Sequence, residues 1–435
     1  MGQAIVFCGL PTQTTKDDRL RHASLHNVPA IRYPFDMSRC LGLLLVSFAV
    51  IAPAADWPQW RGADRDGKSA DTGLLDSWPK GGPRLLWKAQ DLGEGYSGPA
   101  IAGDRLYIQG QQGGQQFVMA YDVHTGKQLW KTPAGQSFNG DRGNGPRGTP
   151  TVEGARLYAL SADGTLVCLE TGTGKRVWEL NLVERFGGRP PNWGYSESPL
   201  VDGGRLIATP GGRAAAVVAL NKNTGDLLWK SQNDPPGYSS AIALDIGGTH
   251  ALALLTAEAA IGLDAKDGAL LWRYPRVANR TANVATPIVH DGYVFFSTDY
   301  GTGCVLLNPT PDGKTAEVYF NRDMRNHYTT SVLVGDYLYG FSSEILTAME
   351  FKTGKVAWKD RSVGKGNCIY AGERLYCMGE DGAVGLIDPT PAAYKEVSRF
   401  EIPRGNFNTW TPPVVANGQF YLREQSNLYC YNVKR

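Results

Sequence analysis

Short apolar runs, separated by turn residues, recur along the chain from about residue 97 onwards. In each repeat a proline leads two or three apolar residues into a glycine-containing turn, and an apolar–aromatic pair follows, as in residues 99–107 and 413–421. Asn-Gly or Asp-Gly between apolar runs is the strongest short-range signal of a β-hairpin. A third apolar run, such as residues 163–169, follows the hairpin. The pattern therefore predicts short antiparallel strands.

A second phrase follows each of these hairpins and ends in tryptophan. It combines an acidic residue with Thr-Gly-Lys, two further residues and Trp, at residues 122–130, 170–178 and 350–358. More divergent copies end at Trp229 and Trp272, and the first four tryptophans lie 48, 51 and 43 residues apart. Each repeat thus supplies four short strands, which is the content of one β-propeller blade.

The repeats count to eight, and the last one is incomplete. Seven complete units run from about residue 97 to about residue 400, and an eighth begins near Thr409 without a fourth strand. A matching strand, residues 85–87, stands at the other end of the pattern, and pairing it with the last blade removes exposed edges. We predict an all-β, eight-bladed propeller of four-stranded antiparallel blades, spanning residues 85–435 and preceded by a loop segment at residues 56–84.

The N-terminal residues have a different character. Residues 1–36 show no periodicity, and we interpret them as a non-native or disordered extension. Residues 37–55 combine a basic start, an apolar run and the small residues Ala52-Pro53-Ala54, a pattern typical of a cleavable signal peptide. We expect a periplasmic or secreted protein without a transmembrane domain after cleavage. An uncleaved N-terminal anchor is the alternative.

Composition and charge agree with this prediction and exclude one class of partner. The chain has 53 Gly and 26 Pro, as expected for many tight turns. Its formal net charge of +2 is close to neutral for 435 residues, and no stripe of Lys or Arg is present. Nucleic-acid binding therefore has no support.

The repeated phrase resembles the tryptophan-docking repeat of PQQ-type propellers. That family includes quinoprotein alcohol dehydrogenases and a bacterial outer-membrane assembly lipoprotein. Residues 56–62 and 186–199 are similar to a subgroup of exported bacterial PQQ-like proteins. The resemblance implies that the docking tryptophans lie between adjacent blades in structural roles. These residues are Trp87, Trp130, Trp178, Trp229, Trp272 and Trp358.

Aligning the repeats places a set of aromatic and charged residues where each blade's innermost strand begins, at one mouth of the central channel. Aromatic faces combined with cations suit a planar anionic ligand such as a quinone, or an acidic loop of a partner protein. Simple filling of a narrow channel is the alternative. The candidates are Tyr96, Arg147, Trp193, Tyr195, Glu197, Tyr238, His327, Tyr328, Lys365 and Trp410.

Catalysis has weaker support than binding. Quinoprotein dehydrogenases hold PQQ against a calcium ion, with a catalytic Asp and an adjacent cysteine pair, but this chain has no two adjacent cysteines. Glu197 could be a lone metal ligand, but no set of oxygen ligands can be assembled around it. We therefore assign no catalytic residue and no metal site, and PQQ with calcium is the one cofactor considered.

The sequence therefore favours a monomeric binding or scaffolding module of the cell envelope with an envelope protein as partner. A PQQ-dependent oxidoreductase and a carbohydrate-binding propeller are the alternatives.

Two cysteines flank a predicted hairpin. Counting outward from a two-residue turn at Gly372-Glu373 places Cys368 directly opposite Cys377, at a position without ladder hydrogen bonds. Such a pair forms either a disulfide or two buried free thiols, and an oxidising compartment permits the disulfide.

Overall fold

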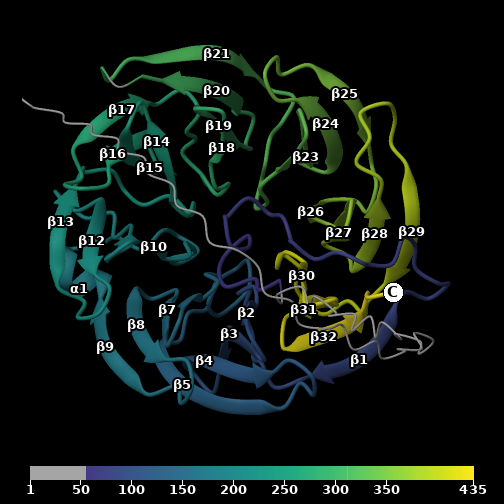
Figure 1. The fold of residues 1–435 in the computed structure, drawn as a ribbon. Coiled ribbons are helices and arrows are strands. Elements are labelled where there is room, and N and C mark those ends of the chain that lie inside the picture. Colours follow the sequence, from purple (N-terminus) through teal and green to yellow (C-terminus); the bar gives the residue numbers. More distant parts are fainter. Residues whose placement is uncertain (1–54, 311) are drawn as a thin grey trace, which may run out of the picture. The chain divides into compact units, whose positions relative to one another are not determined.

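The computed structural model describes residues 55–310 and 312–435, and these residues form an eight-bladed β-propeller (Figure 1). Their strands form eight antiparallel four-stranded sheets. The predicted fold class is thereby confirmed. The predictions for residues 1–36 and 37–55 concern a part of the chain that, apart from Ala55, lies outside the described residues.

We number the blades in chain order, and within blades 1 to 7 the strands run from the innermost to the outermost. Blades 1 and 2 contain β2 (Ala100–Ala102), β3 (Arg105–Gln112), β4 (Gln115–Asp122), β5 (Gln128–Gln136), β6 (Thr151–Glu153), β7 (Arg156–Leu160), β8 (Thr165–Glu170) and β9 (Arg176–Asn181). Blades 3 and 4 contain β10 (Leu200–Asp202), β11 (Arg205–Ala208), β12 (Val217–Asn221), β13 (Leu227–Ser231), β14 (Ile242–Ile246), β15 (Thr249–Leu255), β16 (Ala260–Asp264) and β17 (Leu270–Tyr274).

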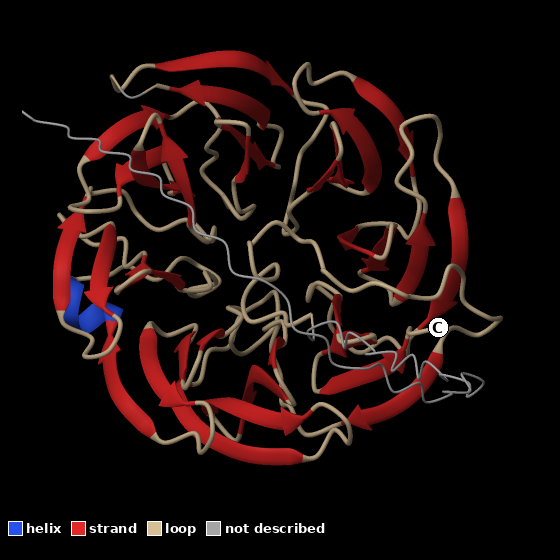
Figure 2. Ribbon diagram, viewed as in Figure 1, coloured by secondary structure: helices blue, strands red, loops and turns tan. Residues whose placement is uncertain are grey.

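Blades 5 to 7 contain β18 (Ile288–His290), β19 (Tyr293–Thr298), β20 (Gly303–Pro309), β21 (Thr315–Asn321), β22 (Val332–Val334), β23 (Tyr337–Ser342), β24 (Ile345–Glu350), β25 (Val356–Asp360), β26 (Gly366–Ala371), β27 (Arg374–Gly379), β28 (Ala383–Ile387) and β29 (Glu396–Glu401). Within the described ranges, helix is confined to α1 (Leu182–Phe186) between blades 2 and 3 (Figure 2). Because α1 has only five residues, the described part of the chain contains no helix that could cross a membrane.

Blade 8 joins the two ends of the propeller. It contains β30 (Val414–Ala416), β31 (Gln419–Glu424) and β32 (Asn427–Asn432), and its outer strand is β1 (Arg84–Ala89). β1 pairs antiparallel with β32, with Leu85 opposite Tyr431 and Lys88 opposite Tyr429. The predicted ring closure is confirmed. Without β1, β32 would expose a row of unpaired backbone groups.

Tryptophans on the outer strands bridge neighbouring blades. Trp87 Nε1 donates to Val123 O of blade 1 over 2.7 Å. Its indole also covers Gly126, where a Cβ atom would come within 2.5 Å of the ring. Glycine is therefore required at position 126 of the Thr-Gly phrase for two reasons: the backbone has a φ of 69°, and the indole occupies the space that a Cβ would need. The same kind of donor bond joins Trp130 to Thr171 O, Trp178 to Lys222 O, Trp229 to Ala265 O and Trp358 to Thr390 O.

The contact between blades 4 and 5 and the contact between blades 5 and 6 depart from this pattern. Trp272 Nε1 is buried without a hydrogen-bond partner in the described structure, and its indole lies over Gly262 of its own blade. In blade 5 a tyrosine takes the docking position, since Tyr319 OH donates to Phe351 O over 2.9 Å and its ring covers Gly354. The hydroxyl of tyrosine thus replaces the indole N–H as the donor.

Residues 56–75, which we call the lacing segment, run across the centre of the propeller (Figure 1, purple). The sequence predicted only a loop here, yet the segment is tied to innermost strands by hydrogen bonds of 2.7–3.0 Å. These bonds reach β2, β6, β26 and the β30–β31 turn. They join Trp57 to Ile101, Pro58 to Val152, Gly67 to Tyr370 and Asp71 to Gly418.

Two buried arginines and a tryptophan extend the lacing segment to the remaining blades. Arg61 donates to Thr330 O and Ser331 O ahead of β22. Arg65 donates to the carbonyl groups of residues 198, 199 and 241, ahead of β10 and β14. Trp60 Nε1 donates to Thr286 Oγ1 in blade 5 over 2.8 Å. Burial lowers the pKa of Arg61 to about 10 and that of Arg65 to about 9, so both remain charged at neutral pH.

Candidate ligand-binding cup

A cavity of about 490 Å³ lies where the chain enters the innermost strands, and we call it the cup. Its volume is within the range of about 300–1,000 Å³ that is usual for small-ligand sites. Trp60 of the lacing segment is part of its lining. Each blade contributes a residue from the loop before its innermost strand. In blade order these residues are Tyr96, Arg147, Ser196, Tyr238, Val284, Tyr328, Lys365 and Trp410.

Aromatic rings in contact with one another form two walls of the cup. Trp410 lies 5.2 Å from Tyr96 and 5.4 Å from Tyr328 between ring centroids, at interplanar angles of 30° and 29°. The second wall is formed by Trp193 and Tyr238, whose centroids are 5.8 Å apart. Trp410 and Tyr328 are stacked and the other two pairs are tilted, and neighbouring rings at these distances stabilise each other beyond the area that they bury. The walls therefore present a preformed apolar surface to a ligand.

Three cations line the cup, Arg142, Arg147 and Lys365, whereas none of the described lining residues is Asp or Glu. Arg142 and Lys365 each lie 3.6 Å from a carboxylate beside the cup, that of Asp141 and that of Glu380, whereas no described carboxylate forms an ion pair with Arg147. The Arg147 guanidinium lies over the rings of Tyr96 and Phe138, 5.4 and 5.0 Å from their centroids. Burial lowers the pKa of Arg147 to about 10, which leaves it protonated at neutral pH. A negatively charged ligand is therefore favoured over a positively charged one.

Two carboxylates beside the cup fix its tryptophans. Trp410 Nε1 donates to Glu380 Oε1 over 2.6 Å, and the same oxygen lies 3.6 Å from Lys365 Nζ. Trp193 Nε1 donates to Asp141 Oδ1 over 2.9 Å. Both indoles are thus held in a defined orientation before any ligand arrives.

His327 contributes a neutral polar edge. Its Nε2 lies 2.9 Å from the hydroxyl of Tyr300, which also lines the cup. Burial, with smaller contributions from Lys365 and Arg142, lowers the pKa of His327 to about 4. The imidazole is therefore uncharged at neutral pH and can donate or accept one hydrogen bond.

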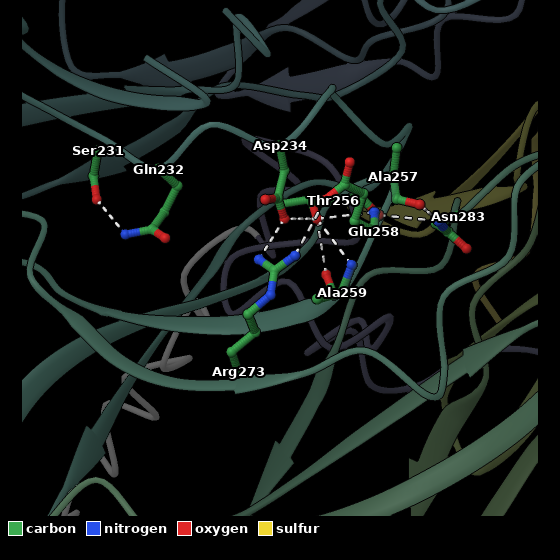
Figure 3. Close-up of polar contacts among 9 residues, drawn as sticks. All are labelled: Ser231, Gln232, Asp234, Thr256, Ala257, Glu258, Ala259, Arg273 and Asn283. Atoms are coloured by element: carbon green, nitrogen blue, oxygen red, sulfur yellow. Dashed lines mark hydrogen bonds and ion pairs between the residues drawn. The ribbon is translucent and has the colours of Figure 1, made fainter. Parts of the chain in front are cut away.

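Figure 3 shows a polar network in blade 4. This network supports the wall of the cup that carries Tyr238, because Tyr238 is hydrogen-bonded to Asn283. Asp234 accepts hydrogen bonds from Thr256 Oγ1 over 2.5 Å and from Arg273 Nη1 over 2.7 Å. The side-chain amide of Asn283 donates to Thr256 O over 3.0 Å, and the main-chain carbonyl of Asn283 accepts from Tyr238 N over 2.9 Å. The network thus joins the loop before β14, the β15–β16 turn and the loop after β17 to Tyr238 of the cup.

Eight of the ten candidate residues line the cup, and Tyr195 and Glu197 do not. Tyr195 is buried between blades 2 and 3, and its hydroxyl donates to Pro210 O over 2.8 Å. The Glu197 carboxylate is buried and accepts from Thr209 N over 2.6 Å, and burial raises its pKa to about 7. Ser196 between them does line the cup, and neighbours in an extended chain point to opposite sides.

Sequence reasoning did not find Trp60, Arg142 and Tyr300. Trp60 belongs to the lacing segment, whose two tryptophans and two arginines within residues 57–65 were the available signal. Arg142 lies in the long loop between β5 and β6, and Tyr300 lies in the β19–β20 turn. Neither position is reached by an alignment on the innermost strands.

The residues of the cup do not fit a calcium ion. Calcium takes six to eight oxygen ligands, usually including several carboxylates. The described lining offers no carboxylate, and within residues 55–310 and 312–435 no cluster of three or more His, Cys, Asp or Glu could hold a metal. The aromatic walls and cations do suit a planar anionic ring system without a metal.

Comparison with known proteins places the chain among propellers of this kind. Outer membrane protein assembly factor BamB of Shewanella oneidensis is 24% identical over 247 residues, which cover 54% of this chain and 58% of that protein. Quinoprotein alcohol dehydrogenase PedH of Pseudomonas putida is 23% identical over 57% of this chain and 39% of its own length. The chain thus spans less than two thirds of these relatives.

Solved structures share the fold at low identity. BamB from Moraxella catarrhalis superposes with a TM-score of 0.59 at 16% identity, over 80% of this chain and 99% of that chain. Quinohemoprotein alcohol dehydrogenase from Comamonas testosteroni gives a TM-score of 0.63 at 13% identity, over 87% and 81%. The model of the family described as outer membrane protein assembly factor BamB matches residues 79–185 and 114–360, more than half of the sequence. The chain therefore belongs to this family of PQQ-like β-propellers.

Proposed function

We propose that the protein is an exported module of the cell envelope that binds a partner protein through the cup. The observation that carries this proposal is the cup itself, an aromatic and electropositive cavity to which all eight blades contribute. Tyrosine, tryptophan and arginine are the residues that most often dominate binding energy at protein interfaces. The partner segment is therefore expected to carry carboxylates next to apolar side chains.

The names of the relatives indicate which kind of protein the partner is. Several are called outer membrane protein assembly factors, and the chain shares their family. A protein component of the bacterial envelope is accordingly the partner that we propose. The lacing segment supports this function mechanically, because contacts to every blade make the cup a rigid, preorganised surface.

Site-specific photo-crosslinking in cells tests the proposal. A photoreactive residue would replace Tyr300, which lines the cup and is 45% exposed. The matched control would replace Leu228, which is 51% exposed on the outer strand β13. We expect a discrete crosslinked envelope protein from position 300 only, which Lys365→Glu removes. Equal crosslinking from both positions, or a crosslink insensitive to Lys365→Glu, would contradict the proposal.

Binding of a quinone is the second candidate, favoured by the combination of stacked aromatic rings with Arg147 and Lys365. Calorimetric titration with PQQ, with and without calcium, separates the two functions. Saturable binding at one site that weakens in Lys365→Met and does not need calcium would support a cofactor or ligand site. Absence of binding at high micromolar PQQ would leave the partner protein as the proposal.

A further inference from the structure

The β26–β27 hairpin of blade 7 carries two buried thiols on adjacent strands. Cys368 and Cys377 face each other in the register, and their residues are 2% and 0% exposed. The turn is Gly372-Glu373 with φ values of 49° and 66°, as expected for the two-residue turn predicted from the sequence. The structure thus contains the predicted hairpin, with both cysteines as free thiols.

The position of the pair favours a covalent bond. In an antiparallel hairpin with a two-residue turn, residues that face each other across the strands alternate between hydrogen-bonded and non-hydrogen-bonded pairs. The first pair next to the turn, Ala371–Arg374, is a hydrogen-bonded one. Cys368–Cys377 is the fourth pair, a non-hydrogen-bonded one, where Cα atoms approach to about 4.5 Å. That separation lies at the short end of the range found in disulfides.

The other described cysteines provide internal controls, because none of them faces another cysteine. Across their ladders Cys168 faces Tyr158 and Trp178, Cys304 faces Ser297 and Asn321, and Cys430 faces Trp87 and Tyr421.

The hairpin also connects the thiol pair to the cup. Lys365 lies three residues before Cys368, and Glu380 lies three residues after Cys377. The two ends are joined by a bond of 2.7 Å from Glu380 N to Lys365 O, and Glu380 orients Trp410. Thr409 N also donates to Glu380 O over 3.1 Å. A link between the strands would therefore hold together the base of one cup wall.

We propose that Cys368 and Cys377 are joined by a disulfide in the exported protein, and that this bond stiffens the wall formed by Lys365, Glu380 and Trp410. The two thiols lose two protons and two electrons, and the disulfide of an envelope thiol oxidase accepts them and becomes a dithiol. Because both sulfurs are buried in the folded chain, the bond forms before folding is complete. The proposal rests on the export that the proposed function requires.

Differential alkylation of the full chain, recovered from the envelope fraction, tests the bond without any substitution. The protein is unfolded in denaturant with iodoacetamide, with or without prior reduction, and its peptides are mapped by mass spectrometry. We expect Cys368 and Cys377 to be alkylated only after reduction, and the three control cysteines to be alkylated in both samples. Alkylation of Cys368 and Cys377 without reduction would overturn the proposal.

The same experiment separates this inference from the proposed function. If the protein is recovered only from the cytoplasm, export fails, and refolding in oxidised glutathione then decides whether the pair closes by itself. If the protein is in the envelope and both thiols remain free, export stands and the disulfide is refuted.

Stiffening of the wall has its own measurement. Wild type that is reduced in denaturant and refolded should have a Tm about 2–5 °C below that of the oxidised protein, and hydrogen exchange of its Thr409 amide should be faster. Cys368→Ala/Cys377→Ala should show neither response, whereas Cys168→Ala should keep both. Identical exchange at Thr409 in the oxidised and reduced wild type would show that the bond does not act on the cup.

Discussion

The docking of Trp87 on Gly126 gives a quantitative test of how the propeller closes. Gly126→Ala adds a Cβ that would lie 2.5 Å from Cε3 and 2.7 Å from Cδ2 of the indole. Trp87 stands on β1, so the clash falls on the strand that completes blade 8. Gly154→Ala is the matched control, since Gly154 also has a positive φ of 55° and open space around its Cβ position.

The expected difference follows from the contacts. Both substitutions place a Cβ in the left-handed region, which costs about 1–2 kcal/mol. Gly126→Ala alone adds overpacking against the indole, about 1–3 kcal/mol, and a displaced ring would lose the bond from Trp87 Nε1 to Val123 O, about 1 kcal/mol. Gly126→Ala should therefore destabilise the protein by about 1–4 kcal/mol more than Gly154→Ala does.

Equilibrium unfolding in urea, followed by tryptophan fluorescence and by circular dichroism, measures both variants. A second comparison uses Trp87→Leu, which removes the clashing ring. The loss caused by Gly126→Ala should shrink in the Trp87→Leu background, because the two residues are in contact. Equal destabilisation by Gly126→Ala and Gly154→Ala, or strict additivity with Trp87→Leu, would refute the role assigned to this docking contact.

Further predictions concern the lacing segment and the response to pH. Arg61→Ala removes bonds to two carbonyl groups of blade 6 and should cost about 2–5 kcal/mol in urea unfolding, against less than about 1 kcal/mol for Lys68→Ala, whose ion pair with Asp66 is solvent-accessible. The folded pKa of His327, about 4, lies below its ordinary value of 6.5, so its contribution to stability is full above pH 6.5 and is lost as the pH falls towards 4. His327→Gln should remove this loss from the pH profile of the unfolding midpoint, and an unchanged profile would refute it. The folded pKa of Glu197, about 7, lies above its ordinary value of 4.5, so its contribution is full below pH 4.5 and is lost as the pH rises to 7. Glu197→Gln, which keeps an acceptor for Thr209 N, should flatten that part of the profile, and a profile like that of the wild type would contradict this assignment.

The architecture of the propeller could be predicted from the amino-acid sequence. Strand number, blade number and closure by residues 85–87 follow from local patterns, because turn residues and alternating apolar positions act over a few residues. The register of the Cys368–Cys377 hairpin is of the same kind, since the length of the turn determines it. Alignment of the repeats also reached most of the cup, because equivalent positions in a cyclic repeat converge on one axis.

For residues that no repeat relates, membership of a common surface follows from the folded structure and could not be predicted from the sequence. Trp60 belongs to the lining because the non-repetitive lacing segment contacts all eight blades, and the side-chain hydrogen bonds of this segment join residues up to 361 positions apart. Glu197 and Tyr195 lie outside the cup because their side chains point to the opposite side of the extended chain from that of Ser196. Such placements depend on long-range packing and on the satisfaction of buried carbonyl groups, for which the local sequence carries no signal.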